Sequence, residues 1–178
     1  MDSIAFAFCD AVVGTIKYVP RIDVSFPDAK WNKALQDHTA NRQCFQLYVG
    51  YKDGKWSYRL SNAKLDSKAL LTTVLQQVGP KYLRITDIEV KVSETSTKNI
   101  HMLIKSFKPF LNFPRLSLYD VDSKIPEGDL AELLSSFAKV NICSFFSSCN
   151  GRCAIEFAKQ LMQQDTLIKK ITLLGERD

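Results

Sequence analysis

The segment Phe113-Pro114-Arg115-Leu116-Ser117-Leu118 carries the pattern that decides the fold of this 178-residue chain. An apolar residue or proline is followed, three positions on, by a branched aliphatic residue, and a second aliphatic residue stands two positions later. The frame also occurs as Pro80-x-x-Leu83-x-Ile85, Phe137-x-x-Val140-x-Ile142 and Ile168-x-x-Ile171-x-Leu173. Side chains two apart on a strand point to the same face, so each frame predicts a short strand that buries its aliphatic pair.

Each frame follows an amphipathic helical stretch. The four apolar faces consist of Leu70, Leu71, Val74 and Leu75; Ile100, Leu103, Ile104 and Phe107; Leu130, Leu133, Leu134 and Phe137; and Ile155, Phe157, Ala158, Leu161 and Met162. Asp129 and Glu132 have the spacing of a capping box, which predicts that the third helix starts at Asp129.

A single helix–strand unit cannot bury its own apolar face, whereas stacked units share one core. Residues 44–178 are therefore expected to form a β-hairpin and about four helix–strand units, with a parallel sheet on one side and helices on the other. The frames are unevenly spaced, since the step from Leu116 to Val140 is clearly shorter than the steps before and after it. This irregular spacing favours the alternative, an ordinary α/β domain in which helix–strand alternation mimics repeats.

Residues 1–43 form a separate helical segment in this interpretation. Phe8, Val12, Val13 and Ile16 lie at helical spacing, and Asp28 is placed to cap a helix that carries Trp31 and runs to about residue 42.

The hairpin is predicted around Asp53-Gly54, because both turn positions favour residues that tolerate positive φ. Its aromatic residues alternate with basic ones; the two groups are Tyr48, Tyr51, Trp56 and Tyr58, and Lys52, Lys55 and Arg59. Three interpretations stay open: cross-strand pairing that stabilises the hairpin, contact with a protein partner, or stacking on nucleic-acid bases.

Composition narrows the class of protein. The net charge of +5 is mild and its basic residues are scattered, which makes a nucleic-acid footprint unexpected. The amino-terminal residues do not have the pattern of an export signal, so none is expected, and no apolar run is long enough to span a membrane. Five cysteines without an export signal predict free thiols in a reducing compartment, the cytoplasm or the nucleus.

No constellation in the sequence predicts catalysis, so a non-enzymatic protein without a cofactor is expected. The two histidines, His38 and His101, stand far apart, and no nucleophile-elbow, Walker-type or dinucleotide-binding loop occurs. Cys143, Cys149 and Cys153 have a C-x5-C-x3-C spacing that does not fit a zinc knuckle, so no metal is expected.

A partner-binding surface is expected on the sheet face that the helices leave free. Its candidate residues alternate with the buried positions and are Arg84, Ser117, Tyr119, Asn141, Ser144 and Phe146.

The frames resemble the L-x-x-L-x-L core of leucine-rich repeats, in a divergent version. Ile88, Val121 and Phe145 stand where such repeats place asparagine. The amino-terminal segment, with Ala7-Phe8-Cys9-Asp10 and the helix around Trp31, resembles an F-box without its opening proline. The resemblance extends to an expanded nematode family that joins an F-box-like head to a leucine-rich-repeat-like tail.

This resemblance implies a substrate-recognition subunit of an SCF-type ubiquitin ligase. Its head would bind the ligase adaptor through five apolar residues: Phe8, Val12, Val13, Ile16 and Trp31. One alternative is a solenoid interaction protein that has lost adaptor binding, and another is a nucleic-acid-binding module that uses the basic aromatic hairpin. The last strand, around Ile171 to Leu173, is expected to be an open edge through which two copies associate weakly.

Overall fold

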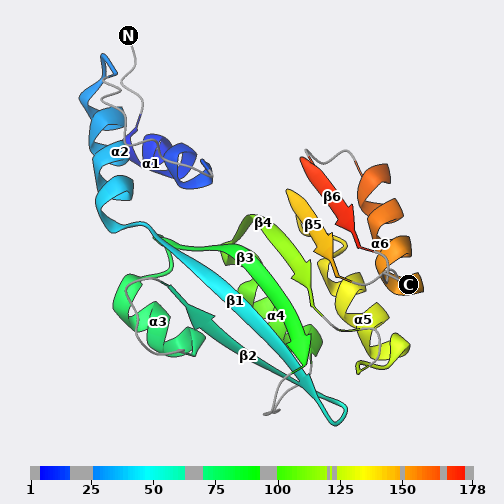
Figure 1. Cartoon of the computed structure of the whole chain (residues 1–178). Helices are drawn as coiled ribbons and strands as arrows, with labels where there is room; N and C mark the ends of the chain where they lie inside the picture. Colours follow the sequence, from blue (N-terminus) through cyan, green and yellow to red (C-terminus); the bar gives the residue numbers. More distant parts are fainter. Residues whose placement is uncertain are drawn as a thin grey trace.

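The computed structural model describes residues 5–16, 26–62, 70–92, 100–119, 121, 124–148, 151–164 and 168–174, without the side chains of residues 100–103 and 112. Figure 1 shows the arrangement of its helices and strands. In chain order these are α1 (Phe6–Thr15), α2 (Ala29–Asn41), β1 (Gln43–Lys52), β2 (Lys55–Ser61), α3 (Leu71–Val78), β3 (Leu83–Val92), α4 (Ile100–Phe107), the 3-10 helix η1 (Lys108–Phe110), β4 (Leu111–Leu118), α5 (Glu127–Phe137), β5 (Ser144–Ser147), α6 (Arg152–Gln163) and β6 (Lys170–Leu173).

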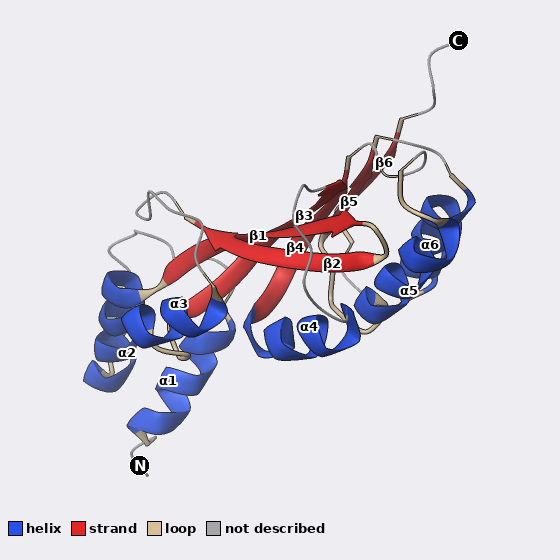
Figure 2. Ribbon diagram, turned by 90° about the horizontal axis from the view of Figure 1, so that it is seen from below, coloured by secondary structure: helices blue, strands red, loops and turns tan. Residues whose placement is uncertain are grey.

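The strands form one mixed sheet in the order β2-β1-β3-β4-β5-β6. The β1–β2 pair is antiparallel, and the other four pairs are parallel. Figure 2 shows α3, α4, α5 and α6 on the same side of this sheet, so none of these four helices covers its other face. The α/β prediction is therefore confirmed. The hairpin is the first part of the same sheet, because β1 pairs in parallel with β3.

Residues that hold the same position in successive sequence frames do not lie side by side on neighbouring strands. Ile88 lies beside Leu116, Leu116 beside Phe145, and Phe145 beside Ile171. These aligned positions are more evenly spaced along the chain than the frames themselves. The prediction that Val140 and Ile142 lie on the third strand of the parallel series is wrong, since both residues precede β5.

A backbone irregularity shifts the register within the β3–β4 pair. The register of β3 and β4 shifts between Ile85 and Asp87, where Leu111 and Arg115 are the partners. Three residues of β4 therefore stand opposite one residue of β3, and one of them, Phe113, has a φ of +48°. A bulged strand of this kind moves the following residues along the ladder while keeping them in the sheet.

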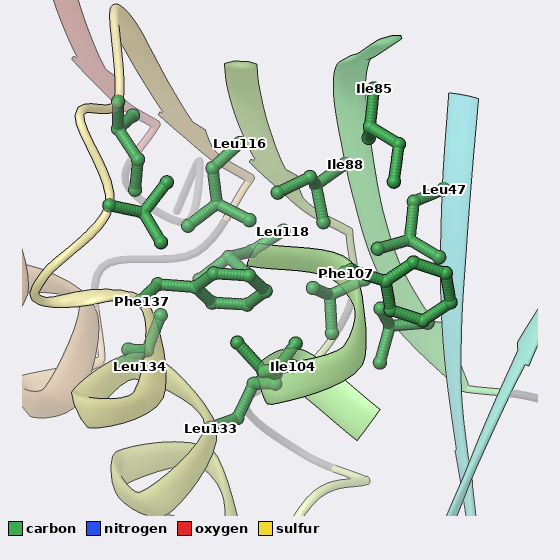
Figure 3. Packing of buried hydrophobic residues seen from close by; sticks show 14 of the residues in the cluster. Leu47, Ile85, Ile88, Ile104, Phe107, Leu116, Leu118, Leu133, Leu134 and Phe137 are labelled. Carbon is green, nitrogen blue, oxygen red and sulfur yellow. The ribbon is translucent and has the colours of Figure 1, made fainter. Parts of the chain in front are cut away.

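The main core lies between the sheet and its helices. Figure 3 shows Leu47, Ile88 and Leu116 from the strands facing Ile104 and Phe107 of α4 and Phe137 of α5, and these side chains are almost completely buried. A second, smaller cluster lies between α1 and α2 and contains Cys9, Val13 and Ala34. The predicted boundary near residue 43 falls between these clusters, and the α1–α2 pair stands at the end of the sheet where β1 begins (Figure 1).

Two local predictions are confirmed and one is wrong. The Asp28 carboxylate accepts a hydrogen bond from the Lys30 amide at 2.7 Å and caps α2. Asp53 and Gly54 have φ values of +48° and +76° at the hairpin turn. However, α5 begins at Glu127 after Pro126, so Asp129 lies inside its first turn and is not the capping residue. A proline before the first turn supplies a preset φ angle and starts the helix earlier.

The edges of the sheet are β2 and β6, and weak association of two copies through β6 stays a prediction. Among the described residues, every helix is too short or too polar to reach across a lipid bilayer.

Candidate functional site

The free face of the sheet brings together four of the six residues predicted for partner binding. Ser117 on β4 lies directly beside Phe146 on β5, and Ser144 precedes them on β5, beside Arg115. The ring of Tyr119 packs at 5.4 Å from that of Phe146 and is 41% exposed. We call this group of Ser117, Tyr119, Ser144 and Phe146 the aromatic patch.

Charged side chains surround the aromatic patch toward β3 and β1. Arg115 contacts the Asp87 carboxylate with its Nε at 2.6 Å and its Nη2 at 2.5 Å. Lys91 lies 2.8 Å from Glu89 and 5.0 Å from the ring centre of Tyr48. Both signs of charge are thus interspersed on this face, with no block of a single sign among these side chains.

Arg84 and Asn141 lie apart from the other four predicted residues. Arg84 lies on β3 just before the register shift against β4, and its Nη2 donates a hydrogen bond to the Gly14 carbonyl at the end of α1, at 2.8 Å. Asn141 precedes β5 and lines the same cavity as Arg84. The strict alternation used to place them on the free face does not hold beyond the regular part of each strand.

The five residues predicted for adaptor binding divide between surface and core. Phe8 is 55% exposed and packs edge-on against Trp31, with ring centres 6.2 Å apart. The ring centre of Phe26 lies 5.9 Å from that of Trp31. Ile16 is exposed just after the end of α1, Val12 is half-buried, and Val13 is buried in the cluster between α1 and α2. We call Phe8, Phe26 and Trp31 the head cluster.

Two arginines join the helical head to the sheet. Arg42 donates from Nη1 to the Ile16 carbonyl at 2.6 Å and from Nη2 to the Val13 carbonyl at 2.7 Å. With Arg84 on Gly14, they satisfy three carbonyl groups at the end of α1, where the helix dipole is negative.

A buried histidine lies at this junction. The His38 ring is completely buried, and its Nε2 is 3.3 Å from the Asp10 carboxylate, which Lys81 also contacts at 2.6 Å. Burial, assisted by the positive charge of Arg42, lowers the pKa of His38, so its ring is neutral near pH 7. The sequence contained one signal for this cluster: Arg42 follows His38 by four positions, the separation of one helical turn, and stands directly after α2.

A cavity of about 610 Å³ opens between the head and the amino-terminal ends of β3 and β4. All its titratable lining residues come from this junction or from the turns before β4 and β5; they are Asp10, His38, Lys81, Arg84, Lys108 and Lys139. Such a volume suits a small molecule.

The hairpin aromatics mainly serve the fold. Tyr51 and Trp56 face each other across the hairpin with ring centres 4.8 Å apart, and both are buried. Tyr58 packs edge-on against Phe107 of α4 at 4.8 Å. The guanidinium group of Arg59, in contrast, lies over the Tyr48 ring, 5.6 Å from its centre. This arrangement supports the cross-strand interpretation for Tyr51 and Trp56.

The cysteines do not gather around a metal in the part of the chain that the structure describes. Cys143 and Cys153 are buried thiols, and no group of three metal-ligating side chains occurs among the described residues. Burial raises the pKa of the Cys153 thiol, beside the carboxylate of Glu127, so it stays protonated near pH 7. Cys149 and the side chain of His101 lie outside the described part.

No protein-family model matches this sequence, and comparisons with curated proteins and with solved structures find no match. The function is therefore inferred from the side chains on the free sheet face, in the head cluster and at the cavity.

Proposed function

We propose that this protein is a non-enzymatic interaction module that holds a protein partner on the free face of its sheet. The observation that carries this proposal is the aromatic patch, in which the rings of Tyr119 and Phe146 pack together near the paired charges of Arg115 and Asp87, on the face that the described helices do not cover. Protein interfaces concentrate binding energy in tyrosine, other aromatic and arginine side chains near their centre.

The mixed charge of this face favours a protein over a nucleic acid. A nucleic-acid surface needs a continuous basic stripe to neutralise phosphates. Here Asp87 and Glu89 stand between Arg115 and Lys91, and each acid is paired with a base. A partner with its own pairs of charges would fit such a surface better than a uniform polyanion does.

A leucine-rich-repeat-like solenoid is the architecture we propose for residues 44–178. The aligned positions Ile88, Leu116, Phe145 and Ile171 recur at nearly equal intervals, and these intervals lie within the range of repeat lengths typical of such proteins. Each unit adds one parallel strand and one helix on the same side of the sheet (Figure 2). Proteins of this architecture often bind partners on the exposed sheet face.

A specific observation favours a second role, recognition of substrates for an SCF-type ubiquitin ligase in the cytoplasm or nucleus. The head cluster leaves Phe8 and Phe26 about half exposed on a helical pair separate from the main core. Exposed aromatic groups of this kind are typical of docking surfaces. The F-box-like head would bind the ligase adaptor through Phe8 and Trp31, while Val13 holds α1 against α2.

A binding assay with the purified adaptor tests the second role. The intact chain is expected to capture the adaptor, and Phe8→Asp is expected to abolish capture because it places a charge in the head cluster. Met162→Asp is the matched control, because Met162 is 65% exposed on α6, far along the chain from the head. An intact chain that captures no adaptor would exclude the ligase role and leave the partner-binding role standing.

The sheet face is tested separately, by affinity capture from a cell extract with quantitative mass spectrometry. A protein enriched by the intact chain and by Met162→Ala is expected to be lost with a Tyr119→Ala/Phe146→Ala double variant. The purified partner should then bind this variant about 100-fold more weakly, as expected for two central aromatic residues. Equal binding to both variants would contradict the proposal, as would steeply salt-dependent binding of oligonucleotides that the double variant abolishes.

A further inference from the structure

The cavity at the head–sheet junction concentrates the positive charge of the chain. Lys81, Arg84, Lys108 and Lys139 line it, and Asp10 is its only carboxylate among the described residues, so its lining carries a formal charge of +3 out of the +5 of the whole protein. His38 adds no charge near pH 7, because burial lowers its pKa. These cations come from the start of β3, from η1 and from the segment before β5, which converge at this place only in the folded chain.

Two of these cations are not used by the fold. Lys81 is paired with Asp10, and Arg84 donates to the Gly14 carbonyl. Lys108 and Lys139, by contrast, are exposed, and neither forms an ion pair with a described residue. Their charge is available to a ligand without breaking an internal contact.

The carbonyl end of α1 borders this cavity, but its partial negative charge is already compensated and would not repel a bound anion. Helix carbonyl ends carry a partial negative charge, which would repel a phosphate. Arg42 and Arg84 already bind the carbonyl groups of Val13, Gly14 and Ile16. The remaining wall contributes apolar surface from Leu111, whereas Asn141 offers an amide donor.

We propose that this cavity binds a small molecule that carries two or more phosphate groups. Lysine ammonium groups are established phosphate ligands, and a cavity of about 610 Å³ is several times larger than one phosphate group. Lys108 and Lys139 bind the terminal phosphates, and Arg84 holds the end of α1 in the cavity wall through the Gly14 carbonyl. The site lies at the head–sheet junction and uses none of the residues of the aromatic patch or the head cluster.

Isothermal titration calorimetry of the full chain tests this site with inorganic phosphate, pyrophosphate and tripolyphosphate as probes. Affinity is expected to increase in that order, because longer chains reach more of the cations. A Lys108→Gln/Lys139→Gln double variant should bind tripolyphosphate about 100-fold more weakly, at about tenfold for each charge-assisted contact removed. Lys159→Gln, an exposed lysine on α6, is the matched control and should bind as the intact protein does.

Thermal unfolding of the free proteins distinguishes a loss of binding from a folding defect. Replacing the two exposed lysines should not alter the melting temperature. Three results would overturn the proposal: no heat with any probe at millimolar concentration, an equal loss of binding with Lys159→Gln, or citrate binding as tightly as tripolyphosphate. The last result would show that negative charge alone is recognised, without preference for phosphate.

Discussion

Replacing Leu116 by alanine tests which face of β4 is buried. Leu116 has no exposed surface and lies between Ile88 and Phe145 on the neighbouring strands. Ser117, the next residue, points to the free face beside Phe146. If the alignment is correct, adjacent substitutions on one strand will have very different costs.

The expected cost of Leu116→Ala has two parts. The substitution removes about three methylene equivalents at about 0.8 kcal/mol each, or about 2.4 kcal/mol of transfer free energy. The cavity left among rigid neighbours adds to this, so a total of about 2.5 to 5 kcal/mol is expected. The total stability of a domain is about 5 to 15 kcal/mol, so this cost is a large and readily measured fraction of it.

Urea unfolding followed by circular dichroism and tryptophan fluorescence measures the free energy of unfolding. Ser117→Ala is the control, and it should change that free energy by no more than about 0.5 kcal/mol. The slope of free energy against urea concentration should be the same for all three proteins. The assignment of faces is refuted if Leu116→Ala costs less than about 1 kcal/mol, or if Ser117→Ala costs as much as Leu116→Ala.

Three further substitutions test individual contacts. Burial and Arg42 lower the pKa of His38, so the unfolded chain binds a proton at this residue more readily, and the free energy of unfolding should fall as the pH drops through about 6.5. His38→Gln should flatten this pH dependence, measured by urea titrations above and below that pH. The same pH dependence in His38→Gln and in the intact protein would contradict this prediction. Tyr51→Phe removes the hydrogen bond from the hairpin to Asp129 and should cost about 1 kcal/mol in the same assay, whereas no cost would show that the bond does not stabilise the fold. Asp28→Ala removes the cap of α2 and should cost about 1 kcal/mol of the stability of the head, measured by amide exchange, with recovery in Asp28→Asn.

Features of the sheet that depend on a few consecutive residues were predicted correctly. Alternating aliphatic residues such as Leu116 and Leu118 were expected to be buried, and they are. The Asp53-Gly54 turn was also expected, because few residue pairs tolerate positive φ at both positions. The frame at Val140 failed because a segment before a strand can bury apolar side chains without joining the ladder.

The candidate site was harder to predict than the fold. Ser117 and Phe146 were placed correctly on the free face by alternation alone. Arg84 obeyed the same alternation in the sequence, yet its side chain reaches the end of α1, seventy positions earlier in the chain. Sequence patterns identify which side chains are unused by the core, but a contact across that separation depends on where the helical head is placed.

The amino-acid sequence by itself determined the class of the fold, the buried face of most strands, the helical faces and two of the local turn and cap structures. These features have the periods of strands and helices, or depend on single residues with restricted φ, and are therefore visible in short windows. Only the tertiary structure decided that Ile88 lies beside Leu116, that β1 joins the parallel sheet, and that four cations from distant segments surround one cavity. An alternating pattern fixes the face of a strand but not its position along the neighbouring strand, because a slip by one full period buries the same face.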